Sequence, residues 1–156
     1  MLLPFFMAAM LSDPSTAKLV PATVPDVVGA AAACFDAAAT KDVQLARLIS
    51  AGWIEALDKA GKPETDGGHL FRRPGVSAEI VVAGPVCSLV APVPTFDDVK
   101  AVLSGVDDAV HPDRIQEVKQ GILLQKGNRQ VLFFVGSPTV KTPAAVRIDI
   151  TNSESR

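Results

Sequence analysis

Residues 78–91, AEIVVAGPVCSLVA, are the longest apolar stretch of the chain that also contains a turn signal. Two β-branched runs flank Gly84 and Pro85, and glycine readily supplies the positive φ that the first position of a two-residue hairpin loop requires. The stretch therefore predicts a β-hairpin. Its register puts Ile80 opposite Leu89 and Val82 opposite Cys87 on one face, with Glu79, Val81, Ser88 and Val90 on the other.

Helical patterns precede this hairpin and also separate it from a later group of strands. Thr23 with Asp26, and Thr95 with Asp98, resemble the capping pairs that begin helices. The connections are mostly short, whereas parallel crossovers would need a helix between most strands. We therefore expect an α+β fold in which an antiparallel β-sheet is covered on one face by N-terminal helices and one mid-chain helix.

Local signals also predict where several elements begin and end. A short helical piece carrying Val43 and Ile49 is expected to end at Gly52, and the helix after Thr95 is expected to end at Gly105, because glycine is common at helix C-termini. Weaker signals favour a strand at 53–57. Later strands are predicted at 118–125, at 131–135 in the middle of the sheet, and at 144–151 with one wet face.

Length and charge limit the class of protein. The chain has 156 residues, of which 48% are hydrophobic and 21% charged, as is typical of one globular domain. Fifteen basic and 17 acidic residues give a net charge of −2. A chain so nearly neutral has no overall field that would draw it to nucleic acid or to an anionic membrane, so we expect neither partner.

The N-terminus resembles an export signal. Residues 1–11, MLLPFFMAAML, have the length of a signal-peptide core and are shorter than a membrane span. Small residues at Ser15 and Ala17 fit a cleavage site before Lys18, although no basic residue precedes the apolar run. We expect an incomplete signal peptide at 1–17, one domain at 18–151 and a polar tail at 152–156. The processed protein would be periplasmic or secreted without a membrane span, and cytoplasmic if 1–17 is not a signal.

The chain contains two cysteines, Cys34 and Cys87. Cys34 lies on the apolar stripe of the first predicted helix, and Cys87 lies on the apolar face of the hairpin. An exported protein would join them in a disulfide that ties helix to sheet. The alternative is two separate buried thiols. Two cysteines and two scattered histidines do not have the spacing of a zinc site, and no cofactor motif is present, so we expect no metal and no cofactor.

One loop carries the residue types that recur in binding sites. Residues 66–73, DGGHLFRR, combine two glycines with His69, Phe71, Arg72 and Arg73, which we take as candidate binding residues. The competing interpretation is a solvated connection whose Leu70 and Phe71 are tucked into the core.

No catalytic motif points to an enzyme. The chain lacks a GxSxG elbow, a Walker loop and an HExxH helix. The leading hypothesis is a small exported domain that binds a protein or a small ligand without catalysis. One alternative is a hydrolase whose site combines His69, His111 and carboxylates. Another is a structural or inhibitory partner that pairs through a sheet edge such as 144–151.

Overall fold

The structure, a computed structural model, describes residues 20–134 and 144–155, so the predicted signal peptide at 1–17 lies outside the described residues. It contains α1 (Val24–Ala37), α2 (Leu45–Ser50), α3 (Phe96–Val110) and a short 3₁₀ helix at Ser153–Ser155. The strands are β1 (Ile54–Glu55), β2 (His69–Arg73), β3 (Val76–Ala83), β4 (Val86–Val93), β5 (Arg114–Val118), β6 (Gly121–Lys126), β7 (Arg129–Phe134) and β8 (Ala144–Asn152).

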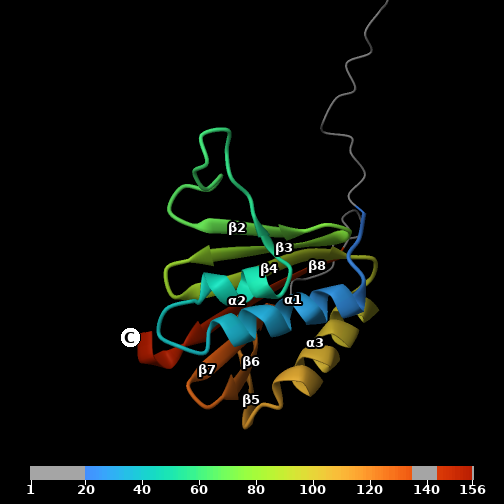
Figure 1. Cartoon of the computed structure of the whole chain (residues 1–156). Helices are drawn as coiled ribbons and strands as arrows, with labels where there is room; N and C mark the ends of the chain where they lie inside the picture. The colour runs from blue at the N-terminus through green and yellow to red at the C-terminus, as the bar shows by residue number, and fades with distance from the viewer. Residues whose placement is uncertain (1–19, 135–143, 156) are drawn as a thin grey trace, which may run out of the picture.

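All eight strands form one antiparallel sheet in the order β1-β2-β3-β4-β8-β7-β6-β5. The three α-helices lie on one side of it (Figure 1), which confirms the predicted α+β class and the helical cover on one face. Each half of the chain has the same plan, because α1 with α2 precedes the meander β1–β4 and α3 precedes the meander β5–β8. The two meanders meet where β4 pairs with β8.

The central hairpin forms in the predicted register. Ile80 pairs with Leu89 and Val82 with Cys87, and all four side chains are buried beneath the helices. Gly84 has a φ of +57°, as the first position of the two-residue loop requires.

The predicted disulfide is present. Cys34 of α1 and Cys87 of β4 are bonded, with their Cα atoms 5.7 Å apart and both side chains fully buried. The bond therefore ties α1 to a middle strand of the sheet, and the alternative of two separate thiols is wrong.

The strand at 144–151 is not an edge. β8 pairs with β4 on one side and with β7 on the other, so its backbone is already engaged and the prediction that it offers a free edge is wrong. The predicted alternation is confirmed: Val146, Ile148 and Ile150 are buried, whereas Arg147 is exposed. Alternation of apolar and polar residues indicates that one face of a strand is exposed to solvent. It carries no information about whether the strand has two neighbours.

The mid-chain helix does not end at Gly105. α3 continues to Val110, so Asp107 and Asp108 lie in its last turn. The position is a close contact between helices: a Cβ added at Gly105 would lie 2.5 Å from Cγ2 of Val28 in α1. Glycine at this position therefore serves the packing of α3 against α1, and the helix stop signal is overridden by tertiary contact.

The predicted strand at 118–125 is two strands. β5 and β6 form a hairpin whose loop is Lys119 and Gln120. The apparent alternation hid the turn because Gly121 resembles an ordinary strand residue in the sequence. In the structure it has a φ of +156°, and a Cβ at this position would overlap the carbonyl oxygen of Phe133.

Two smaller elements also differ from expectation. α2 begins at Leu45 and so excludes Val43, and its buried residue is Leu48, whereas Ile49 is 57% exposed. Asn152, predicted as the start of a polar tail, is the last residue of β8 and is buried, with its side-chain amide donating to the carbonyl of Ala38 at 3.2 Å. The end of β8 is thus anchored to the end of α1.

Replacing both cysteines by alanine is expected to lower the free energy of unfolding by about 4 kcal/mol, because the bond closes a loop with a sequence separation of 53. Urea unfolding followed by the fluorescence of Trp53, the one tryptophan of the chain, measures the change. A reducing agent should lower the midpoint of the parent protein and leave the double variant unchanged. Equal midpoints for the two oxidised proteins would contradict a stabilising role.

Gly105→Ala is expected to destabilise the protein by about 1–3 kcal/mol, because the new methyl group collides with Val28. The matched control is Gly29→Ala in α1, where a Cβ meets no atom within 4 Å. That variant should gain up to about 1 kcal/mol from the higher helix propensity of alanine. Thermal and urea unfolding of both variants test the contact, and a Gly105→Ala protein as stable as Gly29→Ala would refute it.

Candidate functional site: a cleft at the β1–β2 edge

A cleft of about 530 Å³ lies at the edge of the sheet where β1, β2 and the start of β3 meet. We call it the edge cleft. The antiparallel pairing of β1 with β2 forms it, because this pairing sets Ile54 opposite Arg72. Its lining comprises Ile54, Glu55, Ala56, Glu64, Arg72, Arg73, Pro74, Val76, Ser77, Ala78 and Glu79.

Apolar groups provide one part of this lining. Ile54 is 60% exposed although it is a large aliphatic residue in a strand. Pro74 and Gly75 form the tight turn between β2 and β3, in which Gly75 has a φ of +77°, and Val76 follows it. An apolar ligand would therefore find contact surface on β1 and on the β2–β3 turn.

The acidic groups of the edge cleft are paired. The guanidinium of Arg72 donates to Glu79 at 2.9 Å and to Glu64 at 3.4 Å. The hydrogen bond with Glu79 is the main reason that the pKa of Arg72 is raised above its ordinary value. The pairs are half-exposed, so they add little to stability, and the single guanidinium of Arg72 offsets the charge of one of the two carboxylates that share it.

Arg73 differs from its neighbour. Among the described residues no carboxylate lies within ion-pair distance of its guanidinium, and the side chain is exposed. It extends past Gly52, where an added Cβ would lie 3.6 Å from Cζ of Arg73. Gly52 has a φ of +89°, so this position favours glycine for its backbone conformation. The edge cleft thus contains one cation without an acidic partner.

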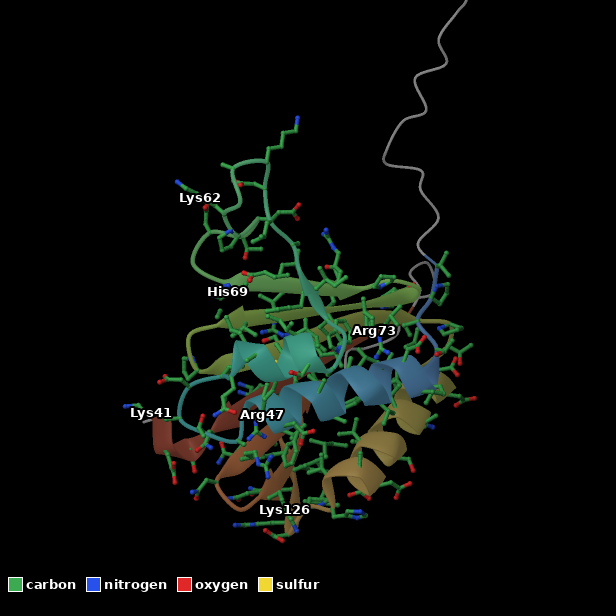
Figure 2. All side chains as sticks on the ribbon, viewed as in Figure 1. Lys41, Arg47, Lys62, His69, Arg73 and Lys126 are labelled. Carbon is green, nitrogen blue, oxygen red and sulfur yellow. A yellow bond between two sulfur atoms is a disulfide. The ribbon has the colours of Figure 1, made fainter. Side chains whose placement is uncertain are left out.

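The third carboxylate belongs to Glu55, which is paired with His69. Nδ1 of His69 lies 2.5 Å from Oε1 of Glu55, with 38% of the histidine side chain and 23% of the glutamate side chain exposed. Figure 2 shows His69 and Arg73 at opposite ends of β2. The Glu55–His69 pair therefore lies beside the edge cleft, on the side away from Arg73.

The structure separates the four residues predicted to bind. Arg72 and Arg73 line the edge cleft and His69 contacts a third lining residue, so these three lie around one site. Phe71 does not: it has no exposed surface and belongs to the core, as the competing interpretation of the loop expected. Burial along β2 does not alternate: Leu70 and Phe71 are both buried and Arg72 and Arg73 are both exposed, and the β2–β3 pairing shifts register between Phe71 and Arg73.

Sequence reasoning missed Ile54, Glu55 and the turn residues of the edge cleft. Ile54 and Glu55 are distant from Arg72 in the chain and reach it only through the β1–β2 pairing, whereas the turn residues follow Arg72 directly in the chain. A local pattern carries no such information. The one available signal was an isoleucine followed by glutamate in a segment too short to be a buried strand.

The two histidines do not share a site. His111 is the residue that ends α3, in a left-handed conformation with a φ of +50°, and it leads into β5. β2 and β5 are six neighbours apart in the sheet order, which at about 4.8 Å per strand amounts to roughly 29 Å. The predicted hydrolase site containing both His69 and His111 is therefore wrong. The turn after His111 is held instead by Asp113, which accepts from the backbone N–H of Gly127 at 3.0 Å.

Within the described residues, no group of three or more histidine, cysteine or acidic side chains could hold a metal ion. No helix in the same part of the chain is long and apolar enough to cross a membrane. A scan against protein-family models and searches of curated proteins and of solved structures found no match to this chain.

Proposed function

We propose that this protein is a non-enzymatic binding domain that holds a small ligand with an anionic group and an apolar body in the edge cleft. The observation that carries this proposal is the position of Arg73, a cation without an acidic partner among the described residues, next to exposed apolar side chains. The Cys34–Cys87 bond supports an oxidising compartment, so we place the protein in the periplasm or outside the cell.

The anionic group follows from the charges. Glu64 and Glu79 share Arg72, and Glu55 contacts His69, so each carboxylate of the cleft has a basic neighbour. Arg73 has no acidic partner among the described residues. A guanidinium presents a planar fork of donors that matches a carboxylate or phosphate group, which makes such an anion its natural partner.

The apolar body follows from the remaining lining. Ile54, Pro74 and Val76 offer aliphatic contact at the same opening as Arg73. A volume of about 530 Å³ lies within the range of small-molecule sites. A ligand of this kind would anchor its charge on Arg73 and cover Ile54, which is otherwise left in water.

The contacts of His69 favour binding over hydrolysis. Its ring makes one side-chain hydrogen bond among the described residues, and the partner is the carboxylate of Glu55. A hydrolase of the nucleophilic type requires a hydroxyl or thiol within reach of the histidine. Both cysteines of this chain are joined in the disulfide, and no described serine or threonine is bonded to His69.

Octanoate serves as the probe, because it joins a carboxylate to an aliphatic chain. Isothermal titration calorimetry should show saturable binding of octanoate to the cleft. Arg73→Met is expected to weaken octanoate binding by about tenfold, since it removes a charge-assisted hydrogen bond and keeps an aliphatic side chain. Arg114→Met, a change at an exposed position of β5, should leave binding unaltered.

Octylamine is the matched ligand of opposite charge and should bind at least tenfold more weakly than octanoate at equal ionic strength. Far-ultraviolet circular dichroism establishes that each variant is folded. Equal binding of the two amphiphiles, or octanoate binding that Arg73→Met does not change, would overturn the proposal. An absence of saturable octanoate binding would do the same.

A further inference from the structure

We infer that β5 is a self-pairing edge, through which two copies of the chain join antiparallel across a twofold axis at Gln116. The contact lies at the opposite end of the sheet from the edge cleft, so this inference does not depend on the proposed ligand site.

The two ends of the sheet differ in how much free edge they offer. β1 has two residues, and the segment after it folds back in an isolated bridge between Leu57 and Pro63. β5 has five residues, and the first four are exposed. It pairs only with β6 among the described strands, so one side of its backbone is open to another strand.

The hairpin fixes which backbone groups face outward. β5 and β6 are joined by a two-residue loop, so the flanking residues Val118 and Gly121 form a hydrogen-bonded pair. Alternation then directs the backbone groups of Glu117 and Ile115 away from β6. In the inferred pairing, Ile115 of one copy lies opposite Glu117 of the other, and each such pair exchanges both of its backbone hydrogen bonds.

Charge selects this register. With Gln116 opposite its own counterpart, Asp113 of each copy, whose carboxylate also accepts from Lys126 and from the backbone of Gly127 in its own chain, lies opposite Lys119 of the other. Moving the axis to Ile115 would place Asp113 opposite Glu117, and moving it to Glu117 would place two glutamates face to face. Like charges directly opposite each other destabilise a strand pair. Of these three registers, which keep the helices of both copies on one side, the one centred on Gln116 is the one without such a clash.

The apolar surface around β5 supports the same contact. Ile115 is 58% exposed on the helix side of the strand, and it lines a mostly apolar cleft of about 260 Å³ with Leu103 of α3 and with Ile122 and Leu124 of β6. In the inferred register, the two copies of Ile115 are diagonal neighbours across the axis, within reach of each other. Pairing would thus cover the large aliphatic side chain that β5 leaves in water.

Sedimentation velocity over a range of concentrations tests the association. A contact limited to one short strand is small, so the expected dimer is weak and concentration-dependent. Lys119→Glu puts two acidic pairs across the axis and should raise the dimer dissociation constant by about tenfold. Lys59→Glu changes the net charge equally at an exposed loop position near the other edge and should leave the constant unchanged.

Cross-linking tests the register. Gln116 lies opposite its own counterpart in a non-hydrogen-bonded pair, whose Cα atoms are close enough for a disulfide, so a Gln116→Cys variant should form a covalent dimer on mild oxidation. Gln120→Cys is the control, because the two copies of that position would lie roughly 27 Å apart at about 3.4 Å per residue. A parent protein that stays monomeric at millimolar concentration, or equal cross-linking of the two variants, would overturn the inference.

Discussion

The pairing of β4 with β8 holds the two halves of this molecule together. It is the longest strand pair in the sheet, with eight matched residues from Val86 opposite Thr151 to Val93 opposite Ala144. Each half supplies a helical cover and a four-strand meander, and the two paired strands, β4 and β8, each contact both α1 and α3. Three features depend on the β4–β8 pairing: the packing of α3 on α1, the burial of Cys87 and the burial of Ile148.

With β4 and β8 paired, β1 and β5 are the two edge strands of the sheet, and these two edges differ in what they expose. At one end, β1 is too short to offer a backbone to a partner, and the surface is instead divided between apolar side chains and paired charges. Arg73 is the cation that this pairing leaves over within the described residues. At the other end, the side chains of β5 make few contacts, and its backbone is available for pairing with another strand. The β1 edge is therefore suited to binding a ligand, and the β5 edge is suited to pairing with another strand.

Local sequence signals predicted the elements whose cause is local. The hairpin at 78–91 follows from alternation and from the glycine in its loop, and the helix after Thr95 follows from a capping box that the structure contains. Local sequence signals failed where contacts with residues distant in the chain determine the structure. In the sequence Gly105 resembles a helix stop, but in the structure it is the point where Val28 packs against α3. The pattern of β8 is compatible with an edge strand, but in the structure β8 has a neighbour on each side. The arginines of the edge cleft were identifiable by residue type, whereas Ile54 and Glu55 join them through pairing across the sheet.

The position of the disulfide has a consequence for how the chain reaches its native state. Both cysteines belong to the first half, so the covalent bond can form as soon as α1 and the first meander have left the ribosome or the export channel. Until β8 arrives, β4 is itself an outer strand, with an apolar face and an open backbone. Such a strand is a template for wrong partners. The time between completion of β4 and docking of β8 is therefore the period in which the newly made chain is most exposed to aggregation, and in which a chaperone would have most to protect.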